Sequence, residues 1–106
     1  MTAPRPIGAL RHRLTLERSS LAADGTLQWA VVGIVFAALD PVGASEAEAG
    51  EALAGRVSHR LEIRWRDDVT SRDRLRLGAR VFRIVATHDL DERRARLVIR
   101  AEEENR

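Results

Sequence analysis

The residues of this 106-residue chain that could ligate a metal or transfer protons are, first of all, its three histidines. His12, His59 and His88 fall on separate predicted elements, and no two have the close His-x-x-x-His spacing of a metal-binding pair. His59 lies in the apolar register of its strand, which favours a core position. Because the chain has no cysteine, thiolate ligands, thiol nucleophiles and disulfides are excluded. We therefore expect no metal and no cofactor.

Acidic residues could act as general acids and bases where two carboxylates face one substrate. The acidic groups Asp67-Asp68 and Asp89/Asp91 fall in predicted turns instead, where aspartate is common. No glycine-rich phosphate loop or nucleophile elbow accompanies them. Because nothing gathers a nucleophile, a base and a group that orients the base, the sequence predicts a protein that is not an enzyme.

Arginine is the most abundant functional side chain, and it supplies all 18 cationic residues. Its planar guanidinium forms bidentate pairs with carboxylates, which suits protein interfaces. Residues 56–100 carry 13 arginines against seven acids, whereas residues 42–55 carry three glutamates and no cation. The net charge is only +2, and two Phe, two Trp and no Tyr leave few stacking platforms for nucleic acid. Protein contacts therefore explain the arginines better than bulk nucleic-acid binding does.

Hydrophobic and polar residues alternate along most of the chain, which is typical of half-buried β-strands. Strands are predicted over residues 10–18, 28–39, 56–66, 74–77, 80–87 and 96–101. Gly33 marks a bulge in the second of them. The core is expected to include the four large aromatic residues, Trp29, Phe36, Trp65 and Phe82. The fold class is therefore all-β, a small antiparallel barrel or sandwich of about six strands.

A single domain is expected to span residues 1–106, with three segments outside the strands. Two prolines keep an N-terminal arm, residues 1–9, extended. Residues 42–55 are rich in Ala, Glu and Gly, and we expect them to form one long mobile loop with one or two helical turns between the second and third strands. Residues 102–106 form an acidic tail.

Hydropathy places no part of the chain in a membrane. No apolar run approaches the roughly 20 residues of a membrane span, and the first residues lack the apolar region of a signal peptide. We therefore expect a protein that is made and assembled in the bacterial cytoplasm. A domain of this size has a thin stability margin, so association with copies of itself would add to its stability.

Four stretches of the chain together carry a family resemblance. They are IGALRHRLTLER at 7–18, Trp29 with VFAALDP at 35–41, RVSHRLEIRWR at 56–66, and GARVFRI at 78–84 with DERR at 91–94 and LVI at 97–99. In this order and spacing they resemble the phage head–tail joining proteins, also called head-closure or stopper proteins, which have relatives in gene transfer agents. The resemblance covers residues 7–103, although residues 42–55 are richer in alanine and glutamate than the family pattern.

The resemblance implies a β-barrel subunit located in the neck of a virion. Copies of it, as a hexamer or a dodecamer, would form a ring below the portal and adaptor proteins and above the tail terminator or tail-joining protein. Double-stranded DNA would pass through the ring, and the ring would help to retain packaged DNA until ejection. In the family, a loop between the second and third strands reaches the channel, and residues 42–55 occupy that place here.

Two sets of candidate site residues follow from these interpretations. The channel-loop candidates are Ser45, Glu46, Glu48, Gly50 and Glu51. The candidates for contacts between subunits or rings are Arg11, Arg13, Arg60, Arg64, Arg66, Arg93 and Arg94. The loop could instead be a solvated surface loop, and the arginines could be solvated charge that blocks edge pairing, or DNA contacts. The alternative function is a small nucleic-acid-binding barrel of oligonucleotide-binding or SH3-like type, which salt-sensitive DNA binding by the isolated protein would reveal.

Overall fold

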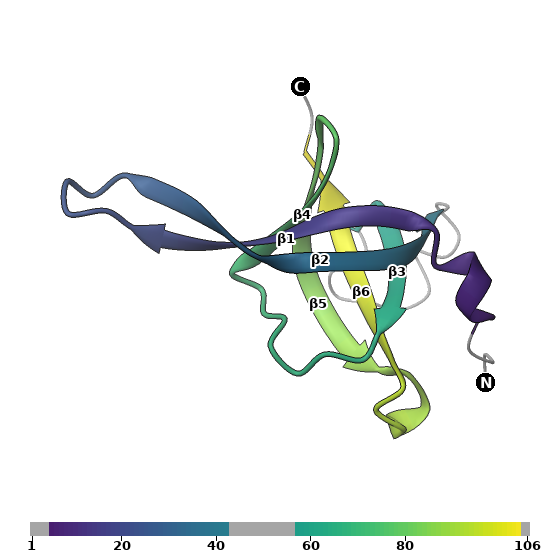
Figure 1. Ribbon diagram of the computed structural model, residues 1–106. Helices are drawn as coiled ribbons and strands as arrows, with labels where there is room; N and C mark the ends of the chain where they lie inside the picture. The colour runs from purple at the N-terminus through teal and green to yellow at the C-terminus, as the bar shows by residue number, and fades with distance from the viewer. Residues whose placement is uncertain (1–4, 43–56, 105–106) are drawn as a thin grey trace.

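The computed structural model describes residues 5–42 and 57–104, which form an all-β barrel (Figure 1). The strands are β1 (His12–Leu21), β2 (Leu27–Pro41), β3 (His59–Arg64), β4 (Asp73–Leu77), β5 (Arg80–Asp89) and β6 (Arg96–Glu103). They pair antiparallel and close in the order β1-β2-β3-β6-β5-β4. The prediction of about six antiparallel strands is confirmed, and of the two predicted architectures the structure is the barrel. Within the described residues, no helix has the length and hydropathy of a membrane span.

Alternate residues of the strands fill the barrel. In β1, for example, Leu14 and Leu16 are buried, whereas Arg13 and Thr15 point outward. The core is made of Leu14, Leu16, Val35, Ala37, Leu61, Ile63, Leu75, Phe82, Ile84, Leu97, Ile99 and Ala101. Full burial of each large apolar side chain contributes roughly 1.5–3 kcal/mol. Within the barrel, closure of the sheet gives every strand a paired neighbour on both sides, so the barrel itself has no exposed strand edge.

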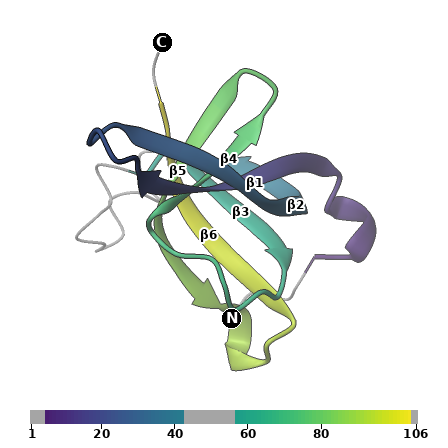
Figure 2. The same cartoon turned by 60° about the vertical axis from the view of Figure 1, so that its left-hand side comes forward.

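The hairpin of β1 and β2 is longer than the barrel, and its outer half projects from it (Figures 1 and 2). Strand β4 pairs with β1 only up to Arg18, and we name residues 19–30, beyond that point, the hairpin arm. At the base of the arm, Ser19 N and Oγ donate hydrogen bonds to the carbonyl of Arg72, the residue before β4. The described residues measure 47 Å along their longest axis, against 28 and 25 Å across it. At the base of the arm the β1–β2 register shifts: Leu16 faces Gly33 and Glu17 faces Val31. The predicted bulge at Gly33 is therefore confirmed.

The N-terminal segment lies over the outer face of the barrel. Glu62 points outward from β3 but is buried, because the Arg5 main-chain N–H donates to its Oε2 at 3.0 Å and Arg96 Nη1 donates to the same oxygen at 2.8 Å. The Arg5 guanidinium also pairs with Asp40. Residues 1–4 lie outside the described part of the predicted arm. Its end, Ile7–Ala9, forms a 3-10 turn (η1) rather than extended chain, because a hydrogen bond from Ala9 N to the carbonyl of Pro6 closes it.

The predicted acidic tail is also shorter than expected. Strand β6 continues to Glu103, because Glu102 and Glu103 pair with β5 and find cations there. Arg83 lies 3.2 Å from Glu102, and Arg80 Nε lies 2.8 Å from Glu103. These ion pairs make acidic residues acceptable at the end of a strand. Residues 105–106 lie outside the described residues.

The turn between β5 and β6 contains three non-glycine residues with left-handed backbones. A second 3-10 turn, η3 (Leu90–Glu92), begins it. The φ angles of Asp91, Glu92 and Arg94 are 57°, 56° and 55°. The Asp89 carboxylate holds the turn by accepting a hydrogen bond from Arg94 N at 2.9 Å. Such a backbone costs about 1–2 kcal/mol per residue for an L-amino acid, so the turn stores strain.

We expect Glu92→Gly to raise the free energy of unfolding by about 0.5–1 kcal/mol, because glycine adopts positive φ without the Cβ clash and this gain exceeds its entropic cost. Arg93→Gly is the matched control, since Arg93 has a φ of −104° and only the entropic cost applies. Urea denaturation of the three proteins measures both effects. The interpretation is wrong if the two variants shift the midpoint in the same direction.

Candidate assembly interface

The outer face of β2 carries large apolar side chains that nothing in the described structure covers. Leu27 on the arm and Val31 at its base point outward, and Ile34 and Phe36 point outward beyond the bulge. Leu21, opposite Leu27 on β1, is 73% exposed. Several large apolar side chains exposed along one strand are typical of a surface that binds something. The outer face of β2 is therefore the first candidate for a binding surface.

The prediction that Phe36 belongs to the core is wrong. Its side chain is 51% exposed, because Val35 and Ala37 take the two inward positions around it. Both faces of β2 are apolar, so the composition of the strand did not reveal which face is buried. Phe82 is fully buried as predicted, and Trp65 packs partly against the core. Trp29 is partly buried outside the core, where the guanidinium of Arg74 stacks over its ring at 4.0 Å.

A groove of about 280 Å³ lies between β2 and the segment that follows β3. We name it the β2 groove, and it is lined by Ile34, Val35, Phe36, Ile63, Arg64, Trp65 and Arg66. Arg13 faces Phe36 across the β1–β2 ladder, so a cation also flanks it from the other side. Neither Arg13 nor Arg64 forms an ion pair with any described residue, and both are exposed. An apolar floor with aromatic rings and a rim of arginine has the composition of a protein-binding surface.

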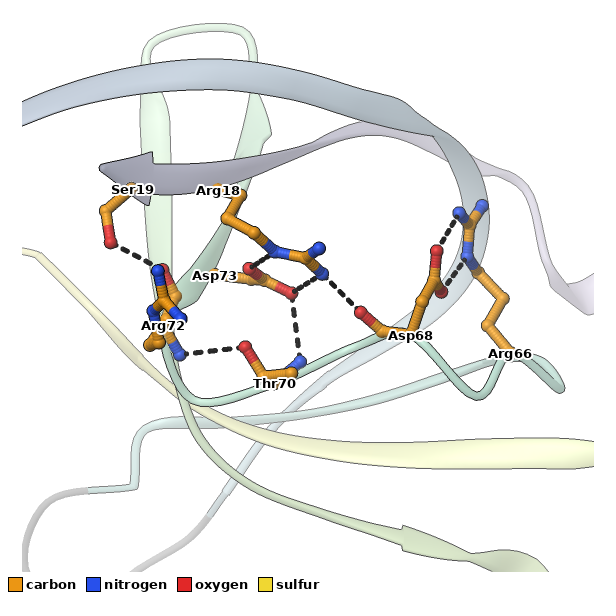
Figure 3. Close-up of polar contacts among 7 residues, drawn as sticks. All are labelled: Arg18, Ser19, Arg66, Asp68, Thr70, Arg72 and Asp73. Atoms are coloured by element: carbon orange, nitrogen blue, oxygen red, sulfur yellow. Dashed lines mark hydrogen bonds and ion pairs between the residues drawn. The ribbon is translucent and has the colours of Figure 1, made fainter.

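The wall of the groove is fixed by an ion-pair network between β1 and the segment after β3 (Figure 3). Arg66 pairs with Asp68 through two hydrogen bonds of 2.9 Å, and Arg18 donates to the carbonyl of Asp68. Arg18 also pairs with the fully buried Asp73 at 2.8 and 3.0 Å. Thr70 N donates to the same carboxylate at 2.9 Å. The segment that carries Trp65 and Arg66 is therefore anchored to the barrel.

The charge state of Asp73 depends on these contacts. Burial raises the pKa of a carboxyl group, but the hydrogen bonds from Arg18 and Thr70 outweigh it, and the pKa of Asp73 lies below its usual value. The carboxylate is therefore charged in the folded protein at neutral pH.

Gly33 also contributes to the wall of the groove, because the Arg66 guanidinium lies 3.4 Å from where a Cβ of residue 33 would be. The bulge leaves room for Arg66 beside β2.

The structure brings together only some of the predicted contact arginines. Arg64 and Arg66 line the β2 groove and Arg13 flanks it, whereas Arg60 lies 3.8 Å from the buried Glu62. The charge of Arg66 is already paired with Asp68. The remaining three candidates are exposed, make no ion pair with a described residue and do not line the groove: Arg11, Arg93 and Arg94.

The five channel-loop candidates, Ser45, Glu46, Glu48, Gly50 and Glu51, lie outside the described residues. The structure does describe the two ends of their segment. Val42 N donates to the carbonyl of Ser58 at 2.9 Å, so the end of β2 and the start of β3 lie side by side. The arm includes the start of β2, and this segment begins after the end of β2, so the arm and the start of the segment are at opposite ends of the same strand.

The histidines take separate positions. His12 and His88 are exposed, and His59 is partly buried, with its ring edge-on to Phe82 at 5.1 Å. Burial lowers the pKa of His59, so its ring is neutral at pH 7. Among residues 5–42 and 57–104, no group of three or more histidine or acidic side chains could hold a metal ion.

Sequence reasoning missed two parts of this site. The exposure of Ile34 and Phe36 could have been predicted from one feature of the sequence, the uninterrupted apolar run in β2. A barrel interior takes only alternate residues of a strand, so half of such a run must be exposed. The Arg18–Asp73 pair joins residues 55 positions apart, and no local pattern marks it.

Comparison with known proteins finds a family and two solved structures that are similar to this chain. The family described as phage head completion protein matches residues 5–104. A protein of Shigella flexneri 2a solved in solution has a TM-score of 0.68 and 25% sequence identity, and the match covers 93% of this chain and 96% of that one. A chain in the virion of a native gene transfer agent particle has a TM-score of 0.62 and 28% identity, over 87% of this chain and 93% of that one. A search of curated proteins finds no significant match.

We expect Asp73→Asn to lower the free energy of unfolding by about 2–4 kcal/mol at neutral pH, because it removes the charge that Arg18 and Thr70 N hold. Since the folded-state pKa of Asp73 is depressed, its stabilisation is present above about pH 4 and is lost as the pH falls through the folded-state pKa. The difference between native protein and variant should therefore shrink in acid. Urea denaturation at neutral pH and in acid below the folded-state pKa measures this difference. Asp67→Asn is the control, because Asp67 is an exposed neighbouring acid. Equal stability of Asp73→Asn and native protein at neutral pH would contradict the interpretation.

Proposed function

The chain belongs to the phage head completion protein family, and from this premise we propose that it is a structural subunit of the neck of a phage-like particle. Copies of it form a ring that joins the DNA-filled head to the tail. The observation that carries the proposal is the family match over residues 5–104, which spans the whole described barrel. The similarity to a chain in a gene transfer agent virion supports the same setting.

The surface of the barrel suits assembly. The β2 groove combines exposed apolar side chains with Arg64, which lines it, and Arg13, which flanks it, and neither arginine has an ion pair among the described residues. A ring subunit needs such surfaces, because it must contact its neighbours, the adaptor or portal proteins on one side and the tail terminator or tail-joining protein on the other. The family is a structural family of virions, which agrees with the expectation that this protein is not an enzyme.

The channel-loop prediction becomes part of this proposal. The segment with Glu46, Glu48 and Glu51 starts and ends at one end of the barrel, where Val42 is bonded to Ser58. In a ring, each copy would present the same three carboxylates to the channel. Repeated negative charge repels phosphates, so double-stranded DNA could slide past the ring without binding to it. The same loops would narrow the channel as a gate and so help to retain the packaged DNA.

The nucleic-acid-binding alternative has less support. At least nine of the 18 arginines pair with carboxylates of the described residues, and these charges are then less available to phosphates. Salt-dependent binding of duplex DNA by the isolated protein would favour this alternative.

Particles produced without this chain should contain heads that lack tails and lose their DNA. The physical reason is that nothing would close the portal or present a surface to the tail. Electron microscopy counts tailed particles, and nuclease protection measures retained DNA. Supplying the native chain in trans should restore both, and supplying a chain without residues 45–53 should restore tails but not DNA retention. Normal tailed, DNA-filled particles in the absence of the chain would contradict the proposal.

A further inference from the structure

The exposed apolar side chains of β2 form two separate surfaces. One is the tip of the hairpin arm, with Leu21 and Leu27, and the other is the β2 groove, with Ile34 and Phe36. We propose that the tip of one copy docks in the β2 groove of the next copy. This inference rests on the proposed function, because the ring supplies the neighbouring copy.

The tip is a preformed apolar surface with one negative charge. Leu21 and Leu27 face each other across the ladder and are 73% and 57% exposed. Between them, Asp24 Oδ1 accepts hydrogen bonds from Thr26 N at 3.0 Å and from Thr26 Oγ1 at 2.7 Å. These bonds fix the turn and lower the pKa of Asp24, so its carboxylate is charged at neutral pH. No cation lies between residues 19 and 30.

The β2 groove complements the tip in both polarity and charge. Its floor presents Ile34 and Phe36. The charge of Arg66 is held by Asp68, but Arg13 and Arg64 have no ion pair among the described residues. A leucine pair that enters the groove would bring the Asp24 carboxylate to a cationic rim. This charge complementarity, together with the match of two apolar surfaces, favours this chain as its own partner.

The tip cannot reach its own groove. Leu27 and Phe36 lie nine positions apart on one continuous strand, which corresponds to roughly 30 Å at about 3.3 Å per residue. The arm also points away from the barrel in both views (Figures 1 and 2). The partner must therefore be another copy.

The two surfaces do not overlap, so the contact is heterologous. Each copy offers its tip to one neighbour and its groove to the other, and a contact of this type closes into a ring when the rotation fits. A single hairpin tip buries much less than the roughly 800 Å² per partner of a stable interface. We therefore expect weak pairing in solution and a ring that forms where the neck holds many copies together.

Disulfide trapping tests this contact without background from other cysteines of this chain, because the native chain has none. Particles are assembled with the double variant Leu27→Cys/Phe36→Cys, oxidised and analysed by non-reducing electrophoresis. We expect a ladder of linked chains that ends at the ring number. A bond within one chain is excluded, since a disulfide needs Cα atoms within about 7 Å. Each single variant should give no species beyond a dimer, and Leu27→Cys/Thr87→Cys, with exposed Thr87 on β5, should give no ladder.

The outcomes separate the contact from the function. If the double variant is present at the neck of tailed particles and gives no ladder, the contact is wrong and the connector function stands. If the native chain is absent from the neck, the proposed function itself fails. Leu21→Cys/Ile34→Cys serves as a second pair if the first does not enter particles.

A charge variant gives an independent measurement. Arg64→Asp places two acids at the contact, and we expect the amount of chain in purified particles to fall about tenfold. Arg72→Asp is the matched control, because Arg72 is exposed, has no ion pair among the described residues and does not line the groove. Incorporation of Arg64→Asp at the native level would overturn the proposal, provided that its unfolding curve equals that of Arg72→Asp.

Discussion

A small closed barrel has one interior, and each strand can place only every second residue in it. Most of the architecture of this protein depends on that constraint. The strand β2 is apolar on both faces, so the barrel buries Val35 and Ala37 and exposes Ile34 and Phe36. The exposed face is a direct consequence of closing a sheet that contains such a strand. It gives the molecule the apolar surface that we propose binds the next copy.

The arginines fall into two groups, those with a carboxylate partner and those without one among the described residues. Many of them lie against carboxylates, as Arg74 does against Glu17 and Arg96 does against Glu62, and they hold strands and loops in place. The Arg18–Asp73 pair belongs to this group, since it anchors the segment that forms one wall of the β2 groove. Arg13 and Arg64 remain without an ion pair among the described residues, at the place where apolar side chains are also exposed. The arginines that stabilise the fold and those that we propose for assembly therefore lie at different positions.

The distribution of these surfaces along β2 agrees with a ring subunit of a head completion protein. The hairpin arm leaves one end of β2, the β2 groove lies along its middle, and residues 43–56 follow its other end. One strand thus links a contact for the next copy to the segment that we propose faces the channel. The ladder between them would determine where Pro41, the last residue of β2, lies once neighbouring copies are docked.

The sequence by itself determined the six strands, the antiparallel barrel as one of two architectures, the bulge at Gly33 and the family resemblance. The strands and the bulge could be predicted because the alternation of side chains and the preferences of turn residues act over a few neighbouring positions. Only the tertiary structure decided which face of β2 is buried, that Phe36 is exposed and that Glu62 is covered by the N-terminal segment. It also decided which arginines are paired, since Arg18 and Asp73 are 55 positions apart. Such contacts depend on how the barrel closes, and a local sequence pattern does not predict which distant residues closure brings together.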